Sequence, residues 1–397
     1  MEKVSARLSK LAVSATLAMT AKSRELKAQG FDVVNLSIGE PDFNTPDYVK
    51  EAAKKAIDDN ITHYPPVPGF PELRKAVSEK FKRENNLEFS PDQIVVSAGA
   101  KHSIINVFLS VLDPGDEVIV PAPYWVSYVE MIKLGEAETV VVPCSIEQDF
   151  KITPQQLEDA ITDKTRAMIF SSPSNPTGSL YSKEELAGLV SVLKKYPRII
   201  IISDEIYEHI NFVGEHQSIA AFNEIKDQVV VVNGVSKGYA MTGWRIGYIG
   251  APLWIAKACT KLQGQFTSAA CSIAQKAAEA AINAGNAACK EMTQVFKTRR
   301  DLVLKLVKDI PGFRTNTPQG AFYIFPDVTE IFGKSYKDKT INNSDDLAMY
   351  LLEQANVATV AGSAFGSPDC LRLSYAASEE ELIKAFNRIK EAIELLR

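Results

Sequence analysis

The stretch Ile199-Ile200-Ile201-Ile202-Ser203-Asp204 decides the fold, because four consecutive β-branched residues lead directly into polar ones. A strand with one solvated face alternates apolar and polar residues, whereas a strand that is apolar at every position is buried on both faces. Strands of that kind belong to mostly parallel sheets with helices packed on each side. The stretch therefore predicts an α/β fold in which Asp204 stands at the carboxyl end of a central strand.

Five similar runs occur between residues 94 and 232, and helical patterns fill the gaps between them. The runs are residues 94–97, 117–120, 139–142, 167–170 and 229–232. One intervening helix, at 182–195, opens with a capping box of Ser182 and Glu185. Because crossovers between parallel strands are right-handed, loops and helix N-termini converge at the carboxyl edge of the sheet. Functional groups are expected at that edge.

The two ends of the chain have a different character. A helix from Ser14 to Gly30 precedes the sheet, and beyond Pro311-Gly312 the pattern changes to short strands and helices. We expect both ends to combine into a smaller α+β domain. The predicted division is an N-terminal arm with part of the small domain at 1–45, a large domain at 46–290, and the rest of the small domain at 291–397.

Composition argues against several functional classes. Lysine and arginine number 44 against 49 acidic residues, so the formal net charge is −5 and no overall field favours nucleic acid. The five cysteines are scattered without CxxC, and the four histidines form no HExxH, so neither a disulfide framework nor a metal centre is expected. No apolar stretch approaches the roughly 20 residues of a membrane span. The expected location is the cytoplasm, with no membrane partner.

One motif points to a different enzyme class and is rejected. Gly234-Val235-Ser236-Lys237-Gly238 fits the GxSxG nucleophile elbow and follows a predicted strand. In an α/β-hydrolase the catalytic histidine follows the serine along the chain, but the last histidine here is His216. The segment is interpreted instead through Lys237, whose amine could form a Schiff base if burial lowers its pKa.

Polar groups that suit an anion surround this lysine in the predicted fold. Ser236 and Arg245 could clamp a phosphate, and the strand end Gly99-Ala100-Lys101 offers backbone N–H groups at a helix start. Each residue alone also fits an ordinary structural role, such as a solvated loop lysine. The combination of complementary groups at the ends of one sheet favours a shared ligand.

Four further side chains at the same edge narrow the ligand to pyridoxal 5′-phosphate. This cofactor needs an amine for its aldehyde, a carboxylate at its pyridine nitrogen, donors to its phenolic oxygen and a flat group over its ring. Asp204 supplies the carboxylate, and Asn175 and Tyr207 supply the donors. Trp125 supplies the flat group.

Ordered motifs along the whole chain support this interpretation. They are Gly39-Glu40-Pro41-Asp42-Phe43, His63-Tyr64, Gly99-Ala100-Lys101, Pro123-Tyr124-Trp125, Asn175-Pro176-Thr177-Gly178, Asp204-Glu205-Ile206-Tyr207, Ser236-Lys237, Gly243-Trp244-Arg245-Ile246-Gly247 and Arg372-Leu373-Ser374-Tyr375. With these motifs the sequence resembles the class I aminotransferases of fold type I. Within that family it is similar to the branch of bacterial aspartate and aspartate/prephenate aminotransferases.

The resemblance implies roles for the residues around the cofactor. Lys237 would form the Schiff base and shuttle a proton, with Asp204 and Tyr207 as further catalytic residues. The cofactor would also contact Gly99, Ala100, Lys101, Trp125, Asn175, Ser236 and Arg245. Tyr64 would reach the phosphate of a neighbouring subunit, which implies a homodimer with shared active sites.

The resemblance also implies how substrate is bound. Arg372 would bind the α-carboxylate in a bidentate fork, with Gly39 and Asn175 beside it. Lys101 would bind the distal carboxylate of an acidic substrate. Trp125 and Thr16 would complete the substrate pocket.

The implied reaction moves an amino group between L-aspartate and 2-oxoglutarate, so the partners are small amino acids and 2-oxoacids. Relatives that also use prephenate tend to carry Lys-Pro where this chain has Ala12-Val13. This difference argues against prephenate, and prephenate or aromatic amino acids are kept as the alternative substrates. Two other possibilities are β-elimination at a C–S bond on the same fold and a cofactor-binding regulator without turnover.

Overall fold

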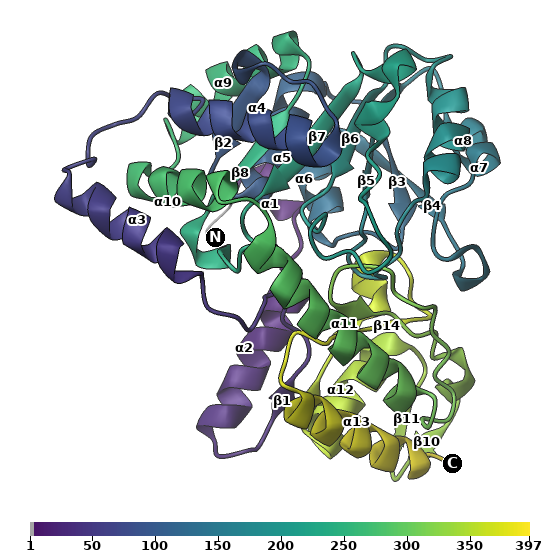
Figure 1. Cartoon of the computed structure of the whole chain (residues 1–397). Helices are drawn as coiled ribbons and strands as arrows, with labels where there is room; N and C mark the ends of the chain where they lie inside the picture. The colour runs from purple at the N-terminus through teal and green to yellow at the C-terminus, as the bar shows by residue number, and fades with distance from the viewer. Residues whose placement is uncertain (1–3) are drawn as a thin grey trace.

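A seven-stranded sheet forms the centre of the larger lobe in the computed structural model, which describes residues 4–397 (Figure 1). The strand order is β2-β8-β7-β6-β5-β3-β4. All neighbours pair in parallel except β8, which is antiparallel to both β2 and β7. The strands are β2 Ile94–Ser97, β3 Glu117–Ala122, β4 Glu138–Pro143, β5 Thr165–Ser171, β6 Ile200–Asp204, β7 Val229–Gly234 and β8 Gly247–Gly250. The predicted mostly parallel α/β fold is confirmed.

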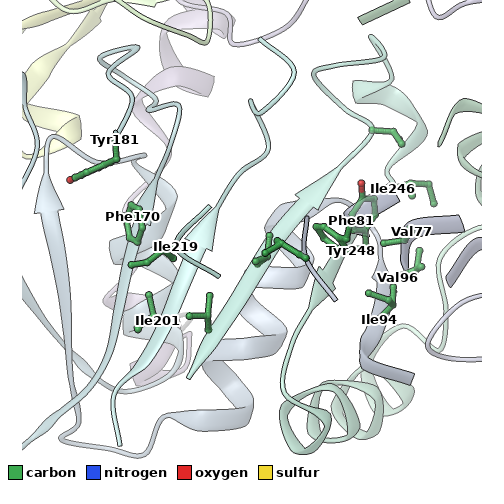
Figure 2. Close-up of a cluster of buried hydrophobic side chains, with 14 of the residues drawn as sticks. Val77, Phe81, Ile94, Val96, Phe170, Tyr181, Ile201, Ile219, Ile246 and Tyr248 are labelled. Carbon is green, nitrogen blue, oxygen red and sulfur yellow. The ribbon is translucent and has the colours of Figure 1, made fainter. Parts of the chain in front are cut away.

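The central strands are buried on both faces, as their continuous apolar runs predict. Along β6, Ile201 packs into a hydrophobic cluster on one face, while Ile200 and Ile202 pack into a second cluster on the other. Figure 2 shows part of the first cluster, in which Phe81 and Tyr248 meet edge to face. Burial on both sides leaves the carboxyl ends of the strands as the place where polar side chains can gather.

Helices cover both faces of this sheet. The first cluster contains residues of α3 Asp47–Asp58, α4 Pro71–Asn85, α7 Pro154–Ala160, α8 Lys183–Leu193 and α10 Ser272–Asn283. The second contains residues of α5 Ala100–Val111, α6 Ser127–Leu134 and α9 Leu253–Phe266. Helix α8 begins with the predicted capping box of Ser182 and Glu185. The short 3-10 helices are Pro91–Gln93, Ile146–Gln148, Ile219–Ala221, Asn223–Ile225, Thr242–Trp244, Thr329–Ile331 and Gly362–Phe365.

The smaller lobe combines the two ends of the chain (Figure 1). Its core joins Val34 and Leu36 to residues between Phe296 and Leu396. Its helices are α2 Ala15–Ala28, α11 Ala287–Val307, α12 Ser344–Ala355 and α13 Glu379–Glu394, and the short α1 Ala6–Ser9 precedes them. Its strands are β1 Val34–Asn35, β9 Tyr323–Ile324, β10 Ser335–Tyr336, β11 Lys339–Thr340, β12 Val357–Ala358, β13 Val360–Ala361 and β14 Leu371–Ser374. The domain boundaries at 45/46 and 290/291 stay predictions.

Strand β8 is the element of the main sheet that the hydrophobic runs do not predict. It begins and ends with glycine, and a Cβ on Gly247 would lie 2.2 Å from the backbone nitrogen of Ala100. A side chain is therefore excluded where β8 passes the start of α5. Among residues 4–397, no helix is long and apolar enough to cross a membrane.

Candidate active site

A cavity of about 260 Å³ lies at the carboxyl edge of the sheet. Most of the predicted site residues line it: Thr16, Gly39, Ala100, Lys101, Trp125, Asn175, Asp204, Tyr207, Ser236, Lys237, Arg245 and Arg372. They come from both lobes, since Thr16 is on α2 and Arg372 is on β14, whereas Asp204 ends β6. The chain folds so that side chains far apart in sequence face one small volume.

Lys237 follows β7 and points its amine toward the smaller lobe's N-terminal segment. Its Nζ donates a hydrogen bond to the carbonyl oxygen of Gly39 at 2.6 Å. Burial lowers the pKa of Lys237 to about 8; Glu40 opposes the shift, and the positive charge of Arg372 adds to it. About a tenth of this amine is therefore neutral and nucleophilic at neutral pH, far more than for an ordinary lysine.

Asp204 is buried in the cavity wall with two donors in place. Its Oδ2 accepts a hydrogen bond of 2.6 Å from the Tyr128 hydroxyl, and its Oδ1 accepts one of 3.3 Å from the Ile206 N–H. Burial raises the pKa of Asp204 to about 6, although the hydrogen bond from Tyr128 opposes that rise. The carboxylate retains lone pairs for a further donor in the cavity.

Arg245 forms an anion site together with the start of α5. Its Nη1 donates to the Thr242 carbonyl at 2.8 Å and its Nη2 to the Ala98 carbonyl at 3.3 Å. Its guanidinium pairs with no carboxylate in residues 4–397. The neighbouring helix begins at Ala100, where backbone N–H groups have no intrahelical acceptor and favour an anion. Gly99 does not line the cavity but lies directly against this guanidinium.

Arg372 is a second unpaired guanidinium, and it is fully buried. Its Nη1 donates to Asn175 Oδ1 at 3.0 Å and its Nη2 to the Ser37 carbonyl at 2.6 Å, while its Nε meets no hydrogen-bond acceptor among residues 4–397. The rings of Tyr323 and Phe365 have their centres 4.7 and 4.9 Å from the guanidinium carbon. A buried charge that lacks a counter-ion among the described residues is costly, so the site favours an anionic ligand.

Lys101 is exposed on the single chain but lies over an aromatic ring. Its Nζ is 4.9 Å from the centre of the Trp125 ring, within the range of a cation–π contact. Partial burial and the charge of Arg245 lower the pKa of Lys101. The cation–π contact holds this ammonium at the cavity wall.

Two tyrosines of the site are not predicted from sequence. Tyr128 bonds Asp204, and the hydroxyl of Tyr323 lies 2.8 Å from that of Tyr207. Tyr128 stands three residues after Trp125, at the start of the following helix, and this closeness in sequence to a predicted site residue was the available signal. Tyr64 lies away from the cavity, with 95% of its surface exposed.

A group with metal-ligating atoms occurs elsewhere in the larger lobe. Ligand atoms of Glu84, Glu208 and His209 lie within 4.8 Å of one another. The ammonium of Lys80 bonds to Glu208 and supplies a positive charge at this position. These side chains and Lys80 therefore form a network of ion pairs.

The chain was compared with known proteins. Residues 32–389 match the family described as aminotransferase class I and II. A probable aspartate/prephenate aminotransferase of Rickettsia conorii is 48% identical over 396 residues, covering 99% of each chain. The structure of an aspartate aminotransferase from Rhizobium meliloti aligns with a TM-score of 0.97 at 42% identity over 100% of each chain. An aspartate aminotransferase from Thermus thermophilus with maleate aligns with a TM-score of 0.93 at 40% identity, over 99% of this chain and 100% of that one.

Proposed function

This chain belongs to the aminotransferases of class I and II, and we propose that it transfers the amino group of L-aspartate to 2-oxoglutarate by a ping-pong reaction. The family depends on pyridoxal 5′-phosphate and acts on amino acids and 2-oxoacids. The observation that carries the choice of substrate is the pair of cations Arg372 and Lys101. Both line the cavity that holds Lys237, and neither is paired with a carboxylate of the described chain.

The residues present fit the cofactor. A Cβ on Gly99 would lie 2.2 Å from Arg245 Nη2, so only glycine leaves room for the guanidinium at the start of α5. Arg245, Ser236 and the N–H groups of Ala100 and Lys101 would hold the phosphate, and Asp204 would accept a hydrogen bond from the pyridine nitrogen. When bound, the cofactor supplies a conjugated ring that takes up the electron pair left when the substrate's α-hydrogen departs as a proton.

Lys237 is the residue proposed to accept and return that proton. Its amine is partly neutral because burial and nearby arginines lower its pKa to about 8. An amine with that pKa is an effective general base near neutral pH and, once protonated, an effective acid. The carbonyl of Gly39 is a hydrogen-bond acceptor at 2.6 Å that orients the amine.

Asn175 connects cofactor and substrate recognition. Its Oδ1 accepts from Arg372, which directs its amide nitrogen elsewhere as a donor, in the proposed role toward the phenolic oxygen. Tyr207 is proposed as the second donor, with the hydroxyl of Tyr323 fixing its orientation. Trp125 is proposed to lie over the cofactor ring, and Thr16 and Gly39, which line the cavity, are proposed to border the substrate.

We also propose that the active unit is a homodimer. The cavity is bordered by Leu17, which is exposed on the single chain, and Val13 beside it is exposed as well. Tyr64 is almost fully exposed, as expected for a side chain that reaches a neighbouring subunit.

We further propose that the protein is located in the cytoplasm. The odd number of scattered, unpaired cysteines supports a reducing compartment of this kind.

The second candidate function is transamination of prephenate. The similar Rickettsia protein has both aspartate and prephenate in its name. Prephenate also carries two carboxylates, although its ring makes it bulkier than 2-oxoglutarate. The same Arg372 and Lys101 would bind it.

An assay with a panel of donors and acceptors tests both functions. Purified protein reconstituted with pyridoxal 5′-phosphate is given L-aspartate, L-glutamate or aromatic donors with 2-oxoglutarate, oxaloacetate or prephenate. The proposal predicts the highest kcat/KM for L-aspartate with 2-oxoglutarate. Turnover confined to aromatic donors or to prephenate would contradict it, and pyruvate and ammonia released without an acceptor would indicate β-elimination.

A further inference from the structure

Asp204 has a buried partner outside the proposed set of cofactor and substrate ligands. Tyr128 lies in the first turn of α6 and is 1% exposed, and its hydroxyl donates to Asp204 Oδ2 at 2.6 Å. The Ile206 N–H occupies Oδ1 at 3.3 Å. The two protein donors therefore take one position on each oxygen and fix the plane of the carboxylate.

The hydroxyl is the part of Tyr128 that needs an explanation. Its ring packs among apolar side chains of the second cluster and meets Trp125 edge to face, with ring centres 5.5 Å apart. Phenylalanine would fill the same space and make the same ring contact. The oxygen atom adds a buried polar group, which is tolerated because it is satisfied by Asp204.

We propose that Tyr128 is a positioning residue whose hydroxyl holds Asp204 ionised and oriented toward the pyridine nitrogen of the cofactor. The inference deepens the proposed function and rests on it, because that function assigns the nitrogen to Asp204. A hydrogen bond from a neutral phenol stabilises the charged carboxylate relative to the neutral acid. Without this hydrogen bond, burial would drive Asp204 toward its neutral acid, which lacks the negative charge that keeps the ring nitrogen protonated.

The charged groups around Asp204 act in both directions: some favour its ionised form and others oppose it. Lys237, which follows β7, favours the ionised carboxylate by its positive charge, and Glu205 beside it in the chain opposes. Glu205 is itself held by His216 at 2.9 Å and by the hydroxyls of Ser203 and Ser218. Tyr128 is therefore the side-chain hydrogen-bond donor to Asp204 among the described residues.

The test is an infrared pH titration of the full chain, with and without pyridoxal 5′-phosphate. Only a protonated carboxylic acid shows the acid C=O band, and Asp204→Asn identifies the band that belongs to Asp204. Tyr128→Phe should raise the pH at which the band appears by about 1 to 2 units, the effect of one charge-assisted hydrogen bond. With cofactor bound, kcat for L-aspartate should fall about 10- to 100-fold with little change in KM.

Tyr350→Phe is the matched control, since it removes a buried hydroxyl that donates to the Ala392 carbonyl far from the cavity. Its band should appear at the wild-type pH. If Tyr128→Phe does not fold, a more acidic fluorotyrosine at position 128 should shift the band to lower pH instead. A Tyr128→Phe band at the wild-type pH would overturn the inference, even if activity fell. The infrared titration contains no substrate and does not depend on turnover. A wild-type protein without transaminase activity would therefore contradict the proposed function but leave the test of Tyr128 valid.

Discussion

Gly99 and Arg245 are in direct contact at the start of α5. Gly99 has φ +90°, and a Cβ on it would lie 2.2 Å from Nη2 and 2.9 Å from Cζ of the guanidinium. The absence of a side chain at one position therefore allows the cation at the other to lie against the helix N-terminus. In the sequence, strands β3 to β7 lie between these two residues.

Gly99→Ala should weaken the binding of pyridoxal 5′-phosphate, because the added methyl displaces Arg245. We expect the dissociation constant to rise at least about tenfold, or about 1.4 kcal/mol, in an absorbance titration. Gly115→Ala is the control, since Gly115 has φ +92° and a Cβ there would meet nothing within 4 Å. Both variants should lose about 1–3 kcal/mol of folding stability through backbone strain. Equal cofactor affinity in the two variants would show that the contact between Gly99 and Arg245 does not contribute to phosphate binding.

Lys237→Ala should abolish transamination while leaving the fold intact, because it removes the amine proposed to act as the base. Borohydride reduction of the wild-type holoenzyme, followed by peptide mass mapping, should find the pyridoxyl group on Lys237. Lys75→Ala, on the exposed side of α4, is the control and should retain activity. An adduct at another lysine would refute the assignment.

Arg372→Ala should reduce kcat/KM for L-aspartate by about 2–5 kcal/mol, roughly 30- to several-thousand-fold. The physical reason is the loss of a buried guanidinium whose Nε lacks a partner and whose fork matches a carboxylate. Arg372→Lys keeps the charge but loses the fork, so it should recover only part of the rate. Arg388→Ala removes a surface arginine bound to Asp32 and should leave the kinetics unchanged. Wild-type kinetics in Arg372→Ala would remove the residue from the site.

Lys101→Met should change the choice of substrate more than the chemistry. Methionine keeps the length of the side chain but loses the charge proposed to meet a distal carboxylate. The ratio of kcat/KM for L-aspartate to that for L-alanine should fall about tenfold or more, the size of one lost ion pair of ~1.4 kcal/mol. Lys133→Met, on α6 and paired with Glu130, is the control. An unchanged ratio would make Lys101 an ordinary surface lysine.

The reactivity of Lys237 should follow its lowered pKa. A lysine attacks an aldehyde only when deprotonated, so its rate of reductive methylation should increase with pH, with a midpoint near 8, and level off above it. Digestion of the methylated protein and mass mapping would follow each lysine separately. The reactivity of surface lysines should continue to increase well above that pH. Because Arg372 contributes to the lowering, Arg372→Met should move the Lys237 midpoint upward. A midpoint at the pH of the surface lysines would contradict the effect of burial.

The α/β fold could be predicted from local sequence because its signal is local. A strand such as β6 shows its burial on both faces in four adjacent residues, and the capping box of Ser182 and Glu185 lies within a single turn. Strand β8 could not be found in this way, since Gly247 is required by Ala100 and Gly250 by Phe89, each more than a hundred residues away in the chain.

The candidate site was predicted as a set of residue types but not as a set of contacts. Lys237, Asp204 and Arg372 could be named because strand ends and ordered motifs mark them. The partners that tune them could not be named, because Tyr128 and Tyr323 look like ordinary core tyrosines in sequence. Which tyrosine meets Asp204 depends on how α6 packs against β5 and β6.

The sequence by itself determined six of the seven strands of the sheet, the position of an amine and an acid at its carboxyl edge, and the family to which the chain belongs. It did so because strand burial, helix caps and motif spacing are properties of short segments. The tertiary structure alone decided that Arg372 donates to Asn175 and meets no carboxylate of residues 4–397, and that Arg245 lies against Gly99. Those arrangements form only when the two lobes and distant strands pack around one cavity. Burial there makes a positive charge without a carboxylate partner costly, so the cavity favours anions.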